Sequence, residues 1–456
     1  MLVSETRDMP EKMDVKELLA KAGKPKELAL KLHPLYRGKI EVGLKVPVRT
    51  LQDFAVWYTP GVAEPCERIR ENRDSVFEYT NRGNFVAVVS DGSRVLGLGD
   101  IGPEAGLPVM EGKALLFKYL GGVDAFPICL GTSEADEIVA AVKWLAPTFG
   151  GINLEDIASP KCYYIFEKLR SELNIPVWHD DQQGTALVTL AGLINALKVV
   201  GKKLKDASIA LIGAGAANIN VAKYLMVAGA KYENMIMVDS KGTLHFGRKD
   251  LEGRDPAKWE MCVRTNPDGV IGGMPESMKD ADACIAYSKS GPGIIKGEWV
   301  RGMANDAIVF AGANPVPEIW PWEAKEAGAR IVATGRSDFP NQINNSLGFP
   351  AVFRGTLDAT AKKITDEMCI AAAYAMARYA EEKGIRDEYI IPTMDEKEMY
   401  VEEAVAVGMK AVEQGVTRKK PNRRKLREMA TTNIDRAQRI AKLLMKERLI
   451  QPFPHG

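Results

Sequence analysis

The sequence predicts an α/β protein built on two mostly parallel sheets, followed by a helical C-terminal region. Short apolar runs typical of buried strands alternate with helical patterns over residues 84 to 333. Pairs of acidic residues end two of these strands, and a glycine turn follows a third. A chain of 456 residues is too long for one compact core. We therefore expect three parts, at residues 1–184, 185–355 and 356–456.

The first part is expected to begin with two short helices, because Gly23 and Pro25 interrupt the helical pattern of residues 12–32. A buried strand at 84–90 leads into a glycine-rich loop at 91–106. The remaining elements alternate as in a parallel sheet with helices on its faces. Helices are expected at 110–120, 134–145 and 160–173, and strands at 125–130, 150–156 and 175–178.

A long apolar helix at 185–200 is expected to join the first part to the second. The second part repeats the alternation, with strands expected at 208–212, 235–238, 283–286, 307–311 and 330–333. The third part is expected to be helical, at 357–384, 397–414 and 433–446. We interpret the basic run from Arg418 to Arg427 as a solvated loop and the start of a helix. A role in subunit contacts stays open.

Composition excludes several classes of function. Lys and Arg total 61 against 60 for Asp and Glu, so a nucleic acid or an anionic membrane would find no excess positive charge. No apolar run approaches the ~20 residues that span a bilayer. We expect a small-molecule substrate, with no nucleic acid and no membrane as partner.

The cysteines and histidines narrow the chemistry. The six cysteines show no CxxC spacing, which favours a reduced, cytoplasmic protein over a disulfide scaffold or zinc site. The stretch from Met1 to Asp14 has no apolar core, so we expect no signal peptide. With four histidines in the chain, a bound metal should have oxygen ligands, and proton transfer falls to Lys, Tyr, Asp or Glu.

The glycine turn lies between the strand at 208–212 and a helix. Gly213 permits the tight turn and Gly215 lets the backbone approach a pyrophosphate. The helix N-terminus supplies N–H groups to the phosphates. The third fingerprint position is Asn218 rather than a small residue, which weakens the motif. The alternative is a glycine turn in an α/β fold without a nucleotide.

Asp239 supports the nucleotide interpretation, because a carboxylate at the end of the next strand commonly accepts a ribose hydroxyl. We therefore predict a Rossmann-type, doubly wound NAD(P)-binding domain. Asp239 favours NAD because it repels a 2′-phosphate, whereas Lys241 and Arg248 could bind one. The choice between NAD and NADP stays open.

Glu155 and Asp156 end one predicted strand, and Asp180 and Asp181 end the next. The carboxyl ends of parallel strands meet at one edge of a sheet, where four carboxylates repel one another unless a cation lies among them. Mg²⁺ or Mn²⁺ suits such an all-oxygen site. The alternative is that Asp156 and Asp181 are helix N-caps.

Three further residues are candidates only in combination. Lys113 starts the helix expected at 110–120, where the helix dipole would lower its pKa as a general base requires. Tyr58 precedes a turn, and Arg94 lies in the glycine loop, where it could clamp a substrate carboxylate. Taken singly, they would be a surface lysine, a half-buried aromatic residue and a solvated turn residue.

These residues together resemble the malic enzyme family in its shorter bacterial and archaeal form. The resemblance runs from about Gly38 to Ala361. It rests on five ordered motifs, namely YTPGVA at 58–63, VLGLGDIG at 95–102, GGINLED at 150–156, HDDQQGTA at 179–186 and TGRSDFPNQ at 334–342.

The resemblance implies roles for single residues. Tyr58 corresponds to the family's acid, Lys113 to its base and Asp180 to a further active-site carboxylate. Glu155, Asp156 and Asp181 fall at the metal-ligand positions. Arg94 would bind substrate and cofactor, and Asn314 and Asn345 would reach the malate carboxylate. Ala214, Gly215, Ala216 and Ala217 align with the family's dinucleotide loop, and a homodimer is implied. Asn218 and the region beyond about Glu381 depart from the pattern.

The implied reaction converts L-malate and NAD(P)⁺ to pyruvate, CO₂ and NAD(P)H with the help of a divalent metal, and extends to decarboxylation of oxaloacetate. A rival interpretation is a metal-dependent oxaloacetate decarboxylase without net redox chemistry. A nucleotide-sensing regulator with a relict site is a third. Formation of NADH from malate separates the first two.

Overall fold

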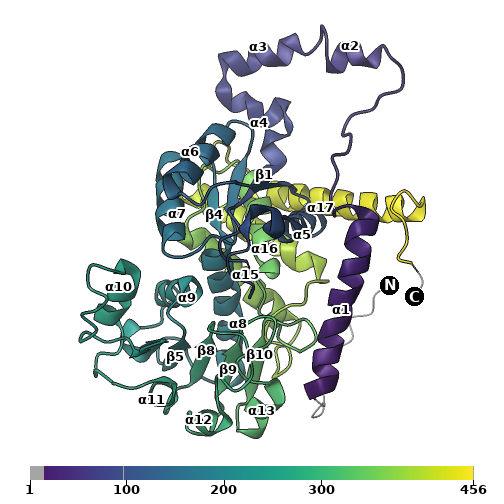
Figure 1. Ribbon diagram of the computed structural model, residues 1–456. Helices are drawn as coiled ribbons and strands as arrows, with labels where there is room; N and C mark the ends of the chain where they lie inside the picture. The colour runs from purple at the N-terminus through teal and green to yellow at the C-terminus, as the bar shows by residue number, and fades with distance from the viewer. Residues whose placement is uncertain (1–14, 96, 455–456) are drawn as a thin grey trace.

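The computed structural model describes residues 15–95 and 97–454. The stretch 1–14, for which we expect no signal peptide, lies outside the described residues. Two sheets form the centre of the molecule, one above the other in Figure 1, and the C-terminal helices pack along both. Within the described residues, no helix is both long and apolar enough to cross a membrane.

The first sheet has four parallel strands in the order β2-β1-β3-β4. Side chains alternate along β1: Val86 and Val88 pack with Met110 and Phe117, whereas Ala87 and Val89 pack with the helices on the other face. The strands are β1 Phe85–Ser90, β2 Asp124–Cys129, β3 Gly151–Leu154 and β4 Val177–His179; the helices are α5 Gly102–Gly121, α6 Ala135–Leu145 and α7 Lys161–Glu172.

The second sheet has the order β10-β9-β8-β5-β6-β7 and is parallel except where β7 pairs with β6. The chain leaves β5 toward β6 and later returns to β8 on its other side, so the strand order reverses between β5 and β8. Ligands of doubly wound sheets bind at such a point. The strands are β5 Ile209–Ile212, β6 Met235–Asp239, β7 Gly242–Thr243, β8 Ala283–Ala286, β9 Ile308–Ala311 and β10 Ile331–Thr334.

Helices cover both faces of the second sheet. The apolar core joins Leu211 and Met237 to α8 and α9 on one face, and Ile212 and Val309 to α11, α12 and α13 on the other. These helices are α8 Thr185–Val199, α9 Ala216–Val227, α10 Pro256–Arg264, α11 Met274–Met278, α12 Gly297–Arg301 and α13 Pro321–Glu326.

The C-terminal helices bind the two halves together. The rings of Phe349 and Phe117 lie 4.6 Å apart, which joins α14 to α5. Gly355 allows α14 to approach α16 closely, because a Cβ there would lie 2.1 Å from the Ala404 carbonyl oxygen. These helices are α14 Phe349–Asp358, α15 Asp366–Glu382, α16 Lys397–Glu413 and α17 Arg423–Lys446.

The strand predictions are confirmed to within two residues at most ends, but four helix predictions are wrong. One helix, α1 Val15–Tyr36, replaces the two expected at residues 12–32 and carries Pro25 inside it. Helix α5 begins at Gly102, because Pro103 is compatible with a first helical turn. The helix expected at 357–384 is two, since the chain breaks between α14 and α15. Helix α17 begins at Arg423, so it includes much of the basic run.

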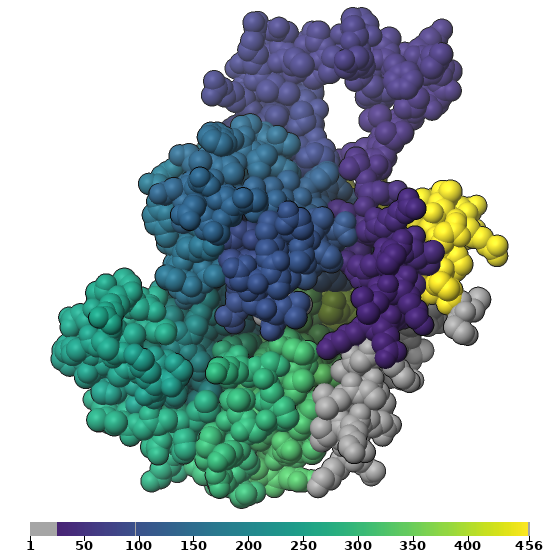
Figure 2. Space-filling model, viewed as in Figure 1, coloured from purple at the N-terminus to yellow at the C-terminus, as the bar shows by residue number. Residues whose placement is uncertain are grey.

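Residues 41–75, which we call the arm, project from the body of the molecule. The arm contains α2 Asp53–Trp57 and α3 Ala63–Glu71 and returns to β1 through α4 Val76–Tyr79. Figure 1 shows α2 and α3 clear of both sheets, and Figure 2 shows an opening between the arm and the body. All its residues are exposed except Asp53, Pro65 and Ile69 and the last residue, Ser75, which are half-buried.

Candidate functional site

The acidic residues after β3 and β4 meet at one edge of the first sheet. Leu154 pairs with His179 across the two strands, so the acids that follow them leave the sheet side by side. Carboxylate oxygens of Glu155, Asp156 and Asp181 all lie within 4.8 Å of one another. Glu155 and Asp156 are buried, and Asp181 is half-buried. The structure thus brings together the three residues for which we expect a metal.

The alternative role of helix capping does not apply. The N-cap of α7 is Pro160 and that of α8 is Gly184, so neither Asp156 nor Asp181 caps those helices. An Asp181 carboxylate oxygen instead accepts the backbone N–H of Asp156 at 3.1 Å. This contact holds the two acidic segments against each other.

The electrostatics of the cluster fit a divalent cation. Burial raises the pKa of Glu155 well above its usual value, and Asp180, Asp181 and Asp156 raise it further against the opposing effect of Lys113. Crowded, buried carboxylates of this kind are stabilised by a cation. The donor set is entirely carboxylate oxygen, which suits Mg²⁺ or Mn²⁺.

Lys113 lies beside this cluster, in the second half of α5 and not at its start. Its Nζ is 2.5 Å from an Asp180 oxygen and 3.0 Å from a Glu155 oxygen. Burial acts to lower the pKa of Lys113, but the two carboxylates outweigh it and raise the pKa above its usual value. The expectation that a helix N-terminus lowers this pKa is therefore wrong, because α5 begins at Gly102.

Two aromatic residues that the sequence analysis missed complete the surroundings of Lys113. The Trp178 indole N–H donates to the second Asp180 oxygen at 3.0 Å, so both oxygens of that buried carboxylate have donors. The Phe349 ring centre lies 4.2 Å from Lys113 Nζ. Trp178 directly precedes the HDD motif, which is a signal of its position; Phe349 has no comparable local signal.

The structure places Arg94 and Asn345 next to this site, and Asn314 beside the loop that carries Arg94. The backbone N–H of Arg94 donates to the Asp156 carbonyl at 3.1 Å, while its side chain is exposed. Asn345 lies next to Asp180, since a Cβ on Gly184 would touch both. Asn314 is exposed on the loop after β9, next to Gly97 in the loop that carries Arg94.

Tyr58 is the candidate that the chain does not bring to the cluster. It follows α2 on the arm and is 71% exposed. Its only hydrogen bonds within the described residues run along the backbone, to Phe54 and Val62 in the arm itself.

The glycine turn after β5 has the form expected of a dinucleotide site. Gly213 has a φ of 101°, and a Cβ there would lie 2.5 Å from the Tyr287 carbonyl oxygen, so a larger residue does not fit. Gly215 has no atom within 4 Å of its Cβ position, which leaves space above the N-terminus of α9 for a phosphate. Ala216 is the first residue of α9.

Asn218, which departs from the sequence fingerprint, forms hydrogen bonds within this turn. Its buried side-chain amide donates to the carbonyls of Ile212 and Gly213, each at 2.9 Å, and reaches the carbonyl of Ile285 at 3.4 Å. The side chain therefore joins the ends of β5 and β8 where the strand order reverses.

Asp239 ends β6 as predicted, but it is not alone. Arg248 donates to both of its oxygens at 3.0 Å, and Lys258 lies 3.9 Å away. Burial acts to raise the pKa of Asp239, and these contacts lower it below its usual value. The carboxylate is thus neutralised by a neighbouring cation at the position where NAD and NADP differ.

The acidic cluster and the glycine turn lie on facing elements. Asp180 to Gly184 form a single π-helical turn before α8, and α9 packs against it. The Asn220 side chain of α9 donates to Gln182 at 3.3 Å. A dinucleotide on α9 would therefore lie beside the carboxylates.

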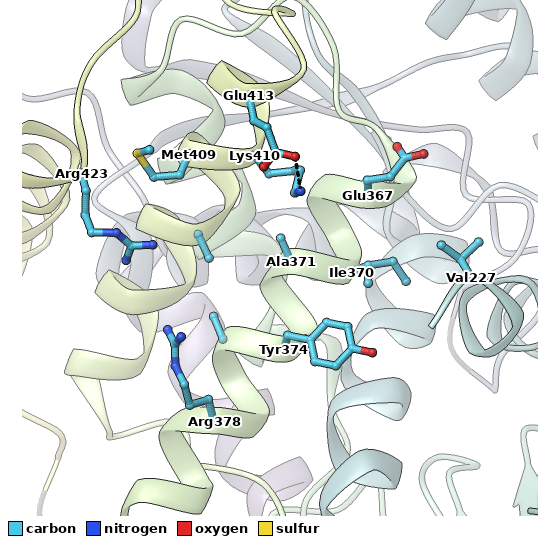
Figure 3. Close-up of a pocket in the computed structure, with 12 residues that line it drawn as sticks. Val227, Glu367, Ile370, Ala371, Tyr374, Arg378, Met409, Lys410, Glu413 and Arg423 are labelled. Carbon is cyan, nitrogen blue, oxygen red and sulfur yellow. Dashed lines mark hydrogen bonds and ion pairs between the residues drawn. The ribbon is translucent and has the colours of Figure 1, made fainter. Parts of the chain in front are cut away.

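A separate hollow of about 470 Å³ lies between α15 and α16 (Figure 3). Tyr374 and Arg378 line one side, and Met409 and the Lys410–Glu413 ion pair line the other. None of the candidate site residues lines it.

Comparisons with known proteins agree with this geometry. Residues 37–170 match the malic enzyme N-terminal domain, and residues 182–319 and 327–412 match the malic enzyme NAD binding domain. The bifunctional malic/malolactic enzyme of Bacillus subtilis is 51% identical over 86% of this chain and 94% of its own length. The NADP-dependent malic enzyme of Halomonas elongata is 42% identical over 84% of this chain and 92% of its own.

Solved structures show the same relationship. The Entamoeba histolytica malic enzyme superposes with a TM-score of 0.94 at 48% identity, over 98% of this chain and 94% of that one. The Pyrococcus horikoshii malic enzyme superposes with a TM-score of 0.89 at 53% identity, over 93% of this chain and 99% of that one. With both family domains matched over most of its length, this chain belongs to the malic enzyme family.

Proposed function

We propose that this member of the family catalyses the oxidative decarboxylation of L-malate to pyruvate and CO₂ with reduction of NAD(P)⁺, and that it also decarboxylates oxaloacetate. The observation that carries the proposal is the single cluster of Glu155, Asp156, Asp181 and the Lys113–Asp180 pair, which faces the glycine turn on α9. A redox cofactor site and an oxygen-ligand site side by side are what this reaction requires.

Glu155, Asp156 and Asp181 would hold Mg²⁺ or Mn²⁺, which when bound supplies a Lewis acid for the hydroxyl and carbonyl oxygens of the substrate. Arg94, Asn314 and Asn345 would hold the malate carboxylates, a role supported by the contact of the Arg94 backbone with Asp156 and by the position of Asn345 next to Asp180. Gly213, Gly215 and the residues of the loop between and after them would bind the dinucleotide.

Lys113 would accept the proton of the malate C2 hydroxyl, and a dinucleotide bound at the glycine turn would supply the hydride acceptor for C2. Because its pKa is raised, the amine must first lose a proton, and Asp180 at 2.5 Å is the acceptor in contact with it. Trp178 would orient that carboxylate through its indole N–H. Tyr58 would donate the proton that C3 needs after CO₂ departs.

Several finer features belong to the same proposal. We propose that the protein is a homodimer and that its domain boundaries lie near residues 184 and 355. We also propose a cytoplasmic location, because the six cysteines show no CxxC spacing. The chain's similarity to a bifunctional malic/malolactic enzyme makes lactate a second product to measure.

The test is a steady-state assay of L-malate with NAD⁺ or NADP⁺, with and without Mn²⁺, in which pyruvate, lactate and NAD(P)H are measured separately. We expect equal amounts of pyruvate and NAD(P)H, and a loss of both in Lys113→Ala. Pyruvate from oxaloacetate without any NAD(P)H from malate would instead establish a decarboxylase. Near-normal malate turnover by Lys113→Ala would refute the role of Lys113.

A further inference from the structure

We propose that Gln182 and Asn220 are positioning residues that couple the two ligands of the site, so that a divalent cation at Asp181 increases the affinity for the dinucleotide on α9. The inference rests on the proposed function, which assigns the cation to the three carboxylates and the dinucleotide to the glycine turn. It begins from a hydrogen bond that neither assignment uses, between a side chain of the π-helical turn Asp180–Gly184 and a side chain of α9.

The π-helical turn carries a proposed metal ligand and the residue that contacts α9 next to each other. Asp181, whose side chain is 39% exposed, is directly followed by Gln182, which is 3% exposed. The Thr185 N–H donates to the Asp180 carbonyl five residues earlier, the bond that defines a π-helical turn. Such turns are rare and occur mostly at functional sites. A movement of Asp181 therefore reaches Gln182 through one peptide bond.

Gln182 is held at both ends of its side-chain amide. Its Oε1 accepts a hydrogen bond from Asn220 Nδ2 at 3.3 Å, and its Nε2 donates to Cys162 Sγ of α7 at 3.8 Å. The next side chain anchors the turn from within, because Gln183 Oε1 accepts the His179 N–H at 3.1 Å. The orientation of the Gln182 amide is thus fixed by the shape of the turn.

Asn220 connects this contact to the first turn of α9. Its amide nitrogen carries two hydrogens and donates to the Ala216 carbonyl at 3.0 Å as well as to Gln182. Ala216 is the first residue of α9, and residues four apart lie on one face of a helix. The N–H groups of this first turn are the proposed phosphate donors. The Asn220 amide therefore joins the metal-bearing turn to the part of α9 that would receive the phosphates.

The direction of the coupling follows from the charges. Carboxylate oxygens of Glu155, Asp156 and Asp181 lie within 4.8 Å of one another, so their repulsion opposes this arrangement until a cation binds. Asp181 is the least buried of the three and has the most room to move. A cation that fixes Asp181 also fixes Gln182 and Asn220, so α9 loses less freedom when the dinucleotide binds. By linkage, the dinucleotide increases the affinity for the cation by the same factor.

The test measures the affinity for each ligand with and without the other. Kd for NADH or NADPH, whichever binds more tightly, is measured by fluorescence with and without Mn²⁺. Kd for Mn²⁺ is measured by electron paramagnetic resonance with and without that dinucleotide. In the wild-type protein we expect each ligand to lower the Kd of the other at least about fivefold, the lower end of the usual coupling between sites.

Two variants remove the contact from opposite sides. Gln182→Met lacks the amide acceptor and Asn220→Leu lacks the amide donor, and both keep side chains of similar size. In each we expect the coupling to fall below about twofold, with the Kd of each ligand alone unchanged. The double variant should match the single variants, because all three lack the same hydrogen bond.

A matched control and a kinetic measurement separate positioning from general damage to the fold. Lys223 also lies on α9, but it pairs with Glu260 of α10 at 3.3 Å, so Lys223→Met should keep the wild-type coupling. In Asn220→Leu at saturating Mn²⁺, KM for the oxidised dinucleotide should rise about fivefold. Its kcat for malate should not change, because Lys113 and Asp180 are untouched. Weaker dinucleotide binding in the absence of Mn²⁺ would show a merely structural role and overturn the inference.

The remaining outcomes distinguish this inference from the proposed function. A wild-type protein that binds both ligands, neither affecting the other, overturns the coupling and leaves the proposed function in place. Coupling that persists in Gln182→Met and Asn220→Leu, or that is lost equally in Lys223→Met, overturns the roles of the two residues. Failure of the wild-type protein to bind Mn²⁺ or either dinucleotide overturns both the inference and the proposed function.

Discussion

Replacement of Asn218 tests whether its side-chain amide, and not its volume, stabilises the cofactor turn. The Gly213 carbonyl loses this donor in Asn218→Ala, which costs about 1–3 kcal/mol because this hydrogen bond is partly buried. The Ile212 carbonyl also accepts the Tyr287 N–H at 3.0 Å and stays paired in the variant. Losing the Asn218 donor therefore costs this carbonyl one net hydrogen bond, about 1 kcal/mol. Asn218 Oδ1 is buried without a hydrogen-bond partner among the described residues. Removing this oxygen in Asn218→Ala therefore raises the free energy of unfolding by about 1 kcal/mol.

The sum is a destabilisation of about 1–3 kcal/mol, centred near 2 kcal/mol. For a domain of 150–250 residues this lowers Tm by about 4–8 °C. The assay is thermal unfolding of the protein without cofactor, followed by determination of KM for NAD⁺ and NADP⁺ at fixed malate. We expect KM for both cofactors to rise, because the Gly213 turn is the proposed site of the pyrophosphate.

Asn218→Asp separates the amide from its volume. Asp matches Asn in size, but ionised Asp has no donor, and keeping it protonated at pH 8 costs free energy because its ordinary pKa is near 4. We therefore expect Asn218→Asp to be less stable than Asn218→Ala. An Asp variant as stable as the wild type, beside a destabilised Ala variant, would refute the hydrogen-bond account and favour simple filling of space.

Three other predictions follow from single contacts. Asp181→Asn should weaken Mn²⁺ binding by more than the ~10–100-fold that outer-shell changes cause, whereas Asp136→Asn on the exposed face of α6 should not; equal Mn²⁺ affinities in calorimetry would exclude Asp181 as a ligand. Arg248→Ala should lower kcat/KM for NADP⁺ relative to NAD⁺ by about 10–100-fold, because it removes a cation and releases Asp239; an unchanged ratio would contradict this. Gly355→Ala should lower stability by about 1–3 kcal/mol, because its Cβ would meet the Ala404 backbone, whereas Gly112→Ala in open space should raise it slightly; denaturant midpoints that move together would refute the close approach.

The parts of the fold with a short-range signal were predictable from the sequence. Apolar runs such as residues 85–90 and 308–311 are buried strands, because nothing else in their neighbourhood competes with that pattern. The acids after β3 and β4 were predictable as neighbours, since parallel strands bring their carboxyl ends together. The start of α5 was not, because its glycines and prolines are typical of a loop until tertiary packing holds them in a helix.

The gathering of Glu155, Asp156 and Asp181 was predictable from the sequence, but the electrostatics around them were not. The pKa of Lys113 is lowered by burial and raised by Asp180 and Glu155, which lie far along the chain, so no local pattern could show that its pKa is raised overall. Asn218 departs from the fingerprint, and only the carbonyls around it reveal why. The position of Tyr58 on an exposed arm likewise depends on the whole fold.

The central claim is that one divalent ion bound by Glu155, Asp156 and Asp181 is required for malate oxidation beside the dinucleotide. The most direct measurement is titration of chelator-treated protein with Mn²⁺, in which bound Mn²⁺ is followed by electron paramagnetic resonance and NAD(P)H formation from malate is followed in parallel. We predict one tightly bound ion per chain and a rate that rises in proportion to it. Full malate oxidation in excess chelator, or a rate that does not follow bound Mn²⁺, would contradict the claim.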